Sequence, residues 1–316
     1  MGKKRVEEID FLKCVLIILM VAFHLAFFAD RHPYAKEFVY TFHMPGFLLV
    51  SGFLAPTWSA GGTRRFFSKR ILWILVPYLI LETTYACASA FLPVRDGLNE
   101  LSIKSLFEAV VLHPVGPYWY LHTLMVCSCI YFGASRWSTW GSLPTFIACS
   151  AAFTLLSIDG VRIIALSSGL YFLIGAAVRR YAGSFLSVFR PRWWMLFPLS
   201  ALAAFPSAFD RLSLGGMAIV YTAVCFIMGC YTFIIYKGVR EALLFVGRNS
   251  LSVLLFSPLF TMAAKWAIPL FSFDPSGICF MLVATPVSVI GSLAIAKCIE
   301  WLKLSPIFFG REKALL

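Results

Sequence analysis

Three histidines lie inside long apolar stretches of the sequence, where a titratable side chain is unusual. They are His24, His43 and His122, and each lies about one helical turn from an end of its stretch. If the stretches are helices that cross a bilayer, a rise of about 1.5 Å per residue places all three imidazoles roughly 6–8 Å below one surface. An imidazole titrates near neutral pH and can transfer protons. We therefore expect a catalytic group of histidines; the alternative is that each histidine makes only a packing hydrogen bond.

Glu82 lies near the middle of another apolar stretch, Ile71–Leu92. A lone carboxylate at the centre of a bilayer is costly, so this group must be protonated, paired or beside water. One role consistent with that position is to orient a catalytic histidine, and the other is a structural hydrogen bond. The sequence leaves both open.

A basic cluster precedes the same stretch and consists of Arg64, Arg65, Lys69 and Arg70. An arginine binds phosphate through its planar, bidentate guanidinium group. The cluster is therefore a predicted docking place for a phosphate-bearing cofactor, although such clusters also anchor helices and contact anionic lipids. Lys13 is a further charge inside an apolar run, close enough to a helix end for its tip to reach the headgroups.

These side chains need a scaffold, and the composition identifies it. Of the 316 residues, 60% are hydrophobic and only 13% are charged, which is too few to coat a soluble protein. The mean hydropathy is +0.84. We predict an all-α membrane protein, a single polytopic bundle of about ten transmembrane helices that forms one domain over residues 1–316. The predicted spans are Phe11–Phe28, Phe38–Pro56, Ile71–Leu92, Tyr118–Ala134, Leu143–Ile158, Ile163–Val178, Trp193–Phe209, Leu214–Tyr236, Leu251–Leu270 and Ile278–Leu302.

The basic residues between the spans predict the topology. With the N-terminus in the cytoplasm, the segments on that side hold 18 Lys and Arg residues and the opposite segments hold six. This asymmetry favours an even number of spans with both termini cytoplasmic. The net charge of +12 is then explained by orientation in the bilayer, and we expect no nucleic-acid partner. The outer segment 93–117 is predicted to carry a short interfacial helix at residues 105–112.

Nine cysteines are present, most of them within apolar runs and without the spacing of metal ligands. We expect them to be free thiols that act as small hydrophobic residues. No metal site is predicted.

Five short motifs occur in an order that is similar to a known family. They are Arg5–Lys13 followed by Val21–His24, Phe42–Phe53, Phe67–Tyr78, Pro117–Leu124 and Gly247–Val253. Together they resemble the bacterial acyltransferase 3 family, which consists of multi-pass membrane proteins that O-acetylate glycans and some small molecules. Two positions depart from the family pattern. Lys13 stands where arginine is usual, and Ser257 precedes Pro258 where histidine is usual.

The resemblance implies a cytoplasmic acetyl-CoA donor, a saccharide hydroxyl as acceptor and a place in the bacterial inner membrane. His24 matches the implied catalytic histidine, and Arg70 with its basic neighbours matches the CoA side. We expect His24 to act as general base, with His43, His122 or Glu82 orienting it or stabilising the oxyanion. The implied CoA-binding residues are Arg64, Arg65, Lys69, Arg70 and Lys13, and the implied substrate-binding residues are Ser51, Trp119 and Tyr120.

Two other functions stay open at this stage. Buried His and Glu residues could form the proton relay of a transporter or flippase for a glycan or small metabolite, although no inverted repeat is visible. A purely structural membrane protein is the third alternative. The sequence does not determine the acceptor hydroxyl, the acyl group, the oligomeric state, or whether transfer is direct or passes through an acyl-enzyme.

Overall fold

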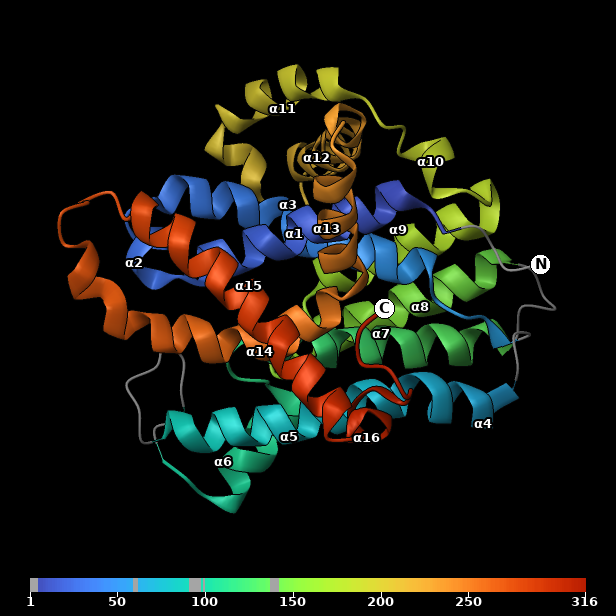
Figure 1. Ribbon diagram of the computed structural model, residues 1–316. Coiled ribbons are helices and arrows are strands. Elements are labelled where there is room, and N and C mark those ends of the chain that lie inside the picture. Colours follow the sequence, from blue (N-terminus) through green and yellow to red (C-terminus); the bar gives the residue numbers. More distant parts are fainter. Residues whose placement is uncertain (1–4, 59–61, 91–97, 99, 137–141) are drawn as a thin grey trace. The chain divides into compact units, whose positions relative to one another are not determined.

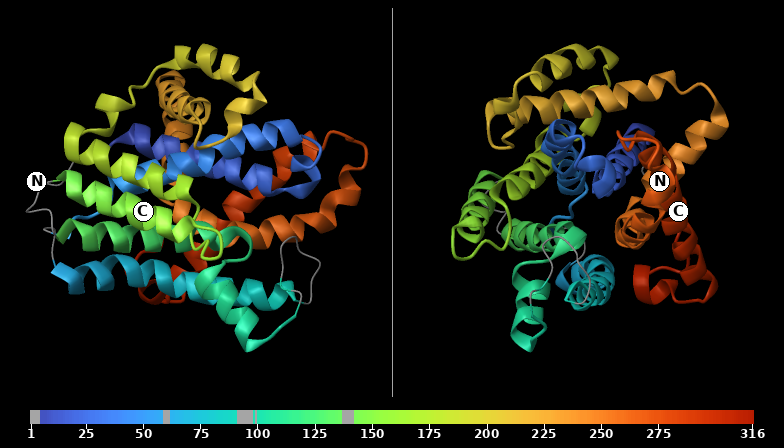
Figure 2. Two further views of the ribbon diagram at one scale, coloured as in Figure 1. Left: turned by 180° about the vertical axis from the view of Figure 1, so that it is seen from behind. Right: turned by 90° about the vertical axis from the view of Figure 1, so that its left-hand side faces the viewer.

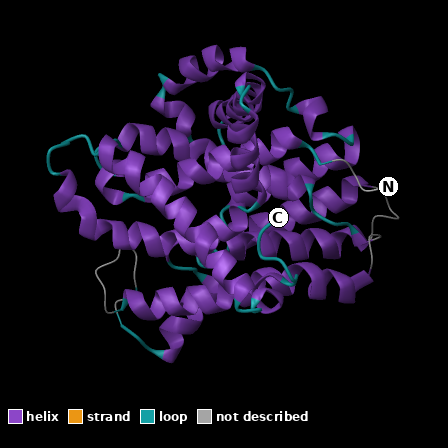
Figure 3. Cartoon of the chain, in the orientation of Figure 1, coloured by secondary structure: helices purple, strands orange, loops and turns teal. Residues whose placement is uncertain are grey.

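The computed structural model describes residues 5–58, 62–90, 98, 100–136 and 142–316, and all regular structure within them is helical (Figure 3). This confirms the predicted all-α class. The chain divides into two compact units. Unit 1 contains Met1–Phe47, Ser184–Trp301 and Lys313–Leu316, and unit 2 contains Leu48–Gly183 and Leu302–Glu312. Each unit is therefore assembled from segments that are distant in the sequence.

Unit 1 combines the N-terminal helices with most of the C-terminal half of the chain. Within it, α14 and α15 pack side by side (Figures 1 and 2). Its elements are α1 (Glu7–His24), α2 (Ala26–Ala29), the first part of α3 (Pro33–Phe53), α10 (Phe185–Val188), η7 (Trp193–Met195), α11 (Leu196–Ala203), η8 (Pro206–Phe209), α12 (Leu214–Cys230), η9 (Tyr231–Phe233), α13 (Lys237–Arg248), α14 (Ser250–Ala263), η10 (Ala264–Phe271) and α15 (Ile278–Trp301).

Unit 2 begins with the last part of α3. Three of its segments, η2, η3 and η6, are π-helical turns that continue an α-helix, a feature that often marks functional sites. After α3, the elements of unit 2 are α4 (Gly62–Phe66), η2 (Phe67–Ile71), α5 (Leu72–Ser89), α6 (Ile103–Phe107), η3 (Glu108–Leu112), η4 (Gly116–Tyr118), α7 (Trp119–Ala134), α8 (Ser142–Ser157), α9 (Leu166–Ala177), η6 (Val178–Ala182) and α16 (Ser305–Phe309).

Four helical stretches of the described chain are long and apolar enough to cross a membrane. They are Leu72–Ser89, Leu214–Phe233, Ser250–Phe271 and Ile278–Trp301. Each of the ten predicted spans coincides with helix for most of its length, but the number of spans and the side on which the termini lie stay predictions. The helix predicted at residues 105–112 is present as α6 and η3.

Two predicted spans are interrupted in the structure. The first breaks at Leu25, whose backbone is extended between α1 and α2. The predicted span Trp193–Phe209 consists of η7, α11 and η8. Its helix is interrupted at Phe205, which has an extended backbone and precedes Pro206. A residue before proline is disfavoured in the α-helical conformation, so the helix stops there.

In unit 2, α3 and α9 approach closely through a reciprocal pair of glycines. A Cβ atom on Gly52 would lie 1.9 Å from the carbonyl oxygen of Phe172, and a Cβ on Gly175 would lie 2.0 Å from the carbonyl oxygen of Leu49. Only glycine permits two helix backbones to come this near, as in small-residue contacts between membrane helices. This contact positions the end of α3, where the predicted substrate-binding residue Ser51 lies.

Candidate active site

The first candidate centre is a pair of histidines in unit 1. His24 ends α1, and its Nδ1 lies 2.7 Å from the carbonyl oxygen of Met20. His43 lies in α3, and its Nδ1 lies 2.9 Å from the carbonyl oxygen of Val39. Because a carbonyl oxygen only accepts hydrogen bonds, Nδ1 must carry the proton in both rings. In the neutral imidazole this leaves a lone pair on each Nε2, as a general base requires.

The ring of Tyr40 lies near both imidazoles. Its centroid is 6.2 Å from that of His24 and 5.0 Å from that of His43. The Tyr40 hydroxyl donates to the carbonyl oxygen of Phe23, at 3.2 Å. The backbone carbonyl of Tyr40 accepts from Nε of Arg211, at 3.1 Å. One tyrosine therefore links α1 and α3 and fixes the separation of the two histidines.

The two histidines differ in access. His43 is only 2% exposed, whereas His24 is exposed although its neighbours Phe23 and Leu25 are buried. The helix also breaks immediately after His24. At membrane depth, a broken helix is tolerated where its backbone is buried in protein or lines a water-filled cavity. His24 is therefore the more accessible member of the pair.

Glu82 and His122 form a second polar cluster, in unit 2. Glu82 is fully buried, and its Oε1 accepts from the backbone N–H of Val115 at 2.6 Å. Nε2 of His122 lies 2.9 Å from the carbonyl oxygen of Val111, so this ring carries its proton on Nε2. The Tyr78 hydroxyl donates to the carbonyl oxygen of Val110 at 2.6 Å. Three side chains from α5 and α7 thus hold residues 110–115 by their backbone.

Each member of that cluster keeps one atom without a partner. Oε2 of Glu82 and Nδ1 of His122 are buried and make no hydrogen bond to any part of the chain that the structure describes. A buried polar atom without a partner costs about 1–3 kcal/mol. These two atoms are therefore available to a bound hydroxyl or a water molecule.

Two arginines cap the C-terminal end of α3. Nη1 of Arg70 donates to the carbonyl oxygen of Leu54 at 3.1 Å, and Nη1 of Arg179 donates to that of Phe53 at 3.2 Å. Both arginines lie in π-helical turns, η2 and η6, and cations favour the negative end of a helix dipole. Burial lowers the pKa of Arg70 from its ordinary value. Its Nε is buried and makes no hydrogen bond to the described residues, so this donor is free for an anion.

The predicted substrate-binding residues lie together in unit 2. The hydroxyl groups of Ser51 in α3 and Tyr120 in α7 are 2.9 Å apart. Trp119 is the first residue of α7, and its ring is perpendicular to that of Tyr120 with centroids 6.4 Å apart. The structure therefore brings these three residues to one place.

No curated protein and no solved structure matches the chain. A family model does match, and its description is an acyltransferase domain, that of the acyltransferase 3 family; it covers residues 6–297. The chain belongs to the acyltransferase 3 family. Membership supports acyltransferase activity in a multi-pass membrane protein. The family model spans segments of both units, and His24, His43, Glu82 and His122 all lie inside it.

Within this acyltransferase, the remaining predicted donor-binding residues belong to different units, with Arg64, Arg65 and Lys69 in unit 2 and Lys13 in unit 1. Arg64 and Arg65 are exposed in α4, and the side chain of Lys69 lies outside the described residues. Nζ of Lys13 pairs with Oδ1 of the buried Asp10 at 2.7 Å. Lys13 therefore has a structural partner, and its role in donor binding stays a prediction.

The predicted group of three histidines is resolved only for its unit 1 pair. His24 and His43 are brought together, whereas His122 and Glu82 belong to unit 2. Convergence of all four groups therefore stays a prediction. Tyr40 and Arg179 were not among the site residues predicted from the sequence. Tyr40 lies one helical turn before His43 on α3, a spacing that indicates a shared helix face.

Proposed function

We propose that the protein transfers an acetyl group from acetyl-CoA to a hydroxyl group of a cell-surface or lipid-linked saccharide in the bacterial inner membrane. Family membership supports the acyl transfer. The observation that carries the chemistry is His24, an exposed histidine at a helix break whose Nδ1 is occupied by a backbone carbonyl and whose Nε2 keeps its lone pair. This is the state of a general base.

In the proposed step, Nε2 of His24 takes the proton of the acceptor hydroxyl as its oxygen attacks the thioester carbonyl carbon. The carbon–sulfur bond then breaks, and the imidazolium returns the proton to the CoA thiolate. His43 and Tyr40 act through His24, because Tyr40 bonds to the carbonyl of Phe23 and so holds the end of α1 that carries His24 against α3.

The donor phosphates are assigned to the basic residues of unit 2. Arg70 offers a buried guanidinium whose Nε is unoccupied by any described residue, and Arg64 and Arg65 are exposed on α4, which leads directly into η2 and Arg70. Ser51, Tyr120 and Trp119 are assigned to substrate binding because the structure groups them at one place. Glu82 and His122 supply the two unpartnered acceptors that could receive a substrate hydroxyl.

The test is transfer of labelled acetyl groups from acetyl-CoA to glycan acceptors by the purified protein in lipid nanodiscs. We expect release of free CoA thiol that depends on the acceptor and is lost in His24→Ala. Comparison of surface-polysaccharide NMR spectra from cells with and without the protein identifies the modified hydroxyl. Wild-type activity of a well-folded His24→Ala protein contradicts the assigned base. Movement of a glycan across the membrane without CoA would instead support the transporter alternative.

A further inference from the structure

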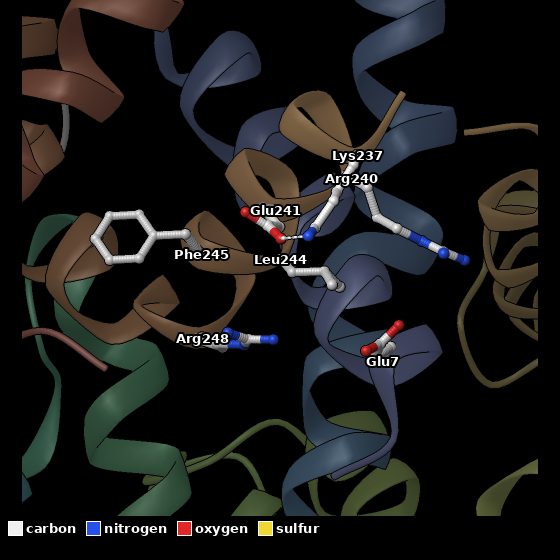
Figure 4. Close-up of a pocket in the computed structure, with 7 residues that line it drawn as sticks. All are labelled: Glu7, Lys237, Arg240, Glu241, Leu244, Phe245 and Arg248. Carbon is white, nitrogen blue, oxygen red and sulfur yellow. Dashed lines mark ion pairs between the residues drawn. The ribbon is translucent and has the colours of Figure 1, made fainter. Parts of the chain in front are cut away.

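A cavity of about 590 Å³ opens between α13 and the start of α1 in unit 1 (Figure 4). Its charged lining consists of three cations, Lys237, Arg240 and Arg248, and two carboxylates, Glu7 and Glu241. None of these residues belongs to the centres described above. The wall is fixed by tight packing, because a Cβ atom on Gly247 of α13 would lie 1.8 Å from the carbonyl oxygen of Asp10.

Two of the three cations keep unused donors. The guanidinium of Arg240 lies 4.5 Å over the ring of Tyr231, and its Nε is buried without a hydrogen bond to any described residue. Nε of Arg248 is 3.6 Å from Oδ2 of Asp10, but that carboxylate is closer to Arg5 at 3.0 Å and Lys13 at 2.7 Å. The Nε of Arg248 likewise makes no hydrogen bond within the described chain.

The two carboxylates are each engaged in ways that leave the cations available. Glu7 accepts a hydrogen bond from the hydroxyl of Tyr231, the residue on whose ring Arg240 stacks. Glu241 pairs with Lys237 at 3.9 Å, with side chains 67% and 88% exposed. A solvated pair at this distance contributes at most about 1 kcal/mol. An anion with a higher charge can therefore displace Glu241 from the lysine.

The position of α13 indicates which anions are present there. The helix follows the candidate span Leu214–Phe233 and precedes the candidate span Ser250–Phe271, so it lies at a membrane–water boundary. Ile235 and Tyr236, immediately before it, are 88% and 80% exposed. An amphipathic helix with basic and aromatic or aliphatic residues is typical of the headgroup layer. Phosphate is the common anion at that depth.

We propose that the cavity beside α13 binds a phosphate group through Arg240, Arg248 and Lys237. The geometry matches phosphate because guanidinium groups bind it with two parallel hydrogen bonds, and the apolar side chains of Leu244 and Phe245 complete the lining. Two sources supply this chemistry, an anionic phospholipid headgroup and the nucleotide part of CoA. The second source rests on the proposed acetyl-CoA-dependent function, whereas the first does not.

The experiment measures ligand-induced thermal stabilisation of the full-length protein in detergent, from tryptophan fluorescence. The probes are short-chain phosphatidylglycerol, short-chain phosphatidylcholine as the uncharged headgroup control, and adenosine 3′,5′-bisphosphate for the nucleotide part of CoA. Stabilisation grows with ligand concentration relative to the dissociation constant. We expect saturable stabilisation by at least one anionic probe and none by phosphatidylcholine.

The variants test the residues. The double substitution of Lys237→Gln and Arg240→Gln is expected to weaken binding about tenfold or more, because it removes two charge-assisted hydrogen bonds to the anion. Arg190→Gln, at an exposed arginine of unit 1 outside the cavity, is the matched control and should bind like wild type. Glu241→Gln should tighten binding, since it removes a competing carboxylate. This opposite sign keeps the test decisive even if the double variant unfolds.

Response to phosphatidylglycerol alone assigns the cavity to lipid, and response to the nucleotide alone assigns it to the donor; both support a phosphate site. If acetyl transfer fails but phosphatidylglycerol still binds, the proposed function is wrong and the phosphate site is retained. The inference is overturned if neither anionic probe binds, if the double variant binds as tightly as wild type, or if Glu241→Gln has no effect.

Discussion

The two histidine centres of this protein use the same side chain in opposite ways. In unit 1, His24 and His43 bond through Nδ1 to the carbonyl four residues earlier on their own helices. In unit 2, His122 bonds through Nε2 to Val111, a residue of a different segment. A bond within the helix orients the ring without joining other parts of the fold. A bond between segments positions backbone, so its loss changes the structure.

This contrast indicates a division of roles. The exposed His24 is suited to chemistry, and the buried pair of Glu82 and His122 is suited to holding residues 110–115 in place while offering acceptors to a ligand. Four experiments follow, from the largest expected effect to the smallest, and the first two test this contrast.

His24→Gln is expected to lower acetyl transfer by about 10²–10⁴-fold, because proton transfer by a positioned base contributes that factor. The melting temperature should change little, since His24 is exposed and its hydrogen bond stays within one helix. Transfer of labelled acetyl groups and thermal melting are measured together. Arg190→Gln, at an exposed arginine of unit 1 outside both centres, is the control. A large loss of stability with little loss of specific activity would reverse the assignment.

Glu82→Leu is expected to destabilise the protein by about 1–3 kcal/mol, because the N–H of Val115 loses its acceptor inside the protein. Glu82→Gln keeps an oxygen at that position and should retain most of the stability. The readouts are melting temperature and the rate of acetyl transfer. If Glu82 only positions the 110–115 segment, Glu82→Gln stays active. Loss of activity at unchanged stability would assign it a direct catalytic role.

Alanine at two glycines of α3 compares two contacts of that helix, one with the backbone of α9 and one with a side chain of α1. Gly52→Ala directs a Cβ at the backbone oxygen of Phe172, 1.9 Å away, and should cost about 1–3 kcal/mol through overpacking. Gly46→Ala meets only a flexible methyl group of Leu16, at 2.9 Å, and should cost less. Melting temperatures of both variants measure the difference. Equal effects would show that α3 and α9 do not depend on close backbone contact.

The smallest effect concerns the loop before α15, which Arg31 and His32 hold by the carbonyls of Pro275 and Ser276. The side chain of Ser276 and the backbone N–H of Cys279 donate to Asp274 and lower the pKa of this carboxyl to about 2, from its ordinary value of 3.8. Its charged form therefore stabilises the fold above about pH 4, and this contribution is lost as the pH falls towards 2.

Melting curves of the wild-type protein and of Asp274→Asn between pH 2 and 5 test the contribution of this carboxylate to stability. The wild-type protein should lose slightly more stability over that range than Asp274→Asn, which cannot titrate. Identical pH dependence of the two proteins would contradict the role of this carboxylate.

Much of the architecture was predictable because it follows from hydrophobicity and family motifs. The low charge content predicted membrane helices, and the five ordered motifs led to the acyltransferase 3 family that the family model shows. The break after His24 was not predictable, since Leu25 is as apolar as its neighbours and no proline marks the site. The segmentation of the run 193–209 had a visible signal in Pro206.

The candidate site likewise contains contacts that the sequence could predict and contacts that it could not. Tyr40 and His43 share a helix turn, so their proximity could have been inferred from spacing alone. The contact of Glu82 with Val115 and that of Arg179 with Phe53 join residues far apart in the chain. Such pairings depend on which helix faces meet, and hydrophobic periodicity along one chain does not specify that.

By itself, the sequence determined that the protein lies in a membrane, that it is helical and which kinds of groups are available for catalysis. These properties depend on composition and on the local order of residues along the chain. Only the tertiary structure decided which nitrogen of each histidine is free, which buried atoms lack a partner and which cations surround the α13 cavity. Those properties arise from backbone carbonyls and side chains brought together by packing, and a proton's location depends on the atom that faces it.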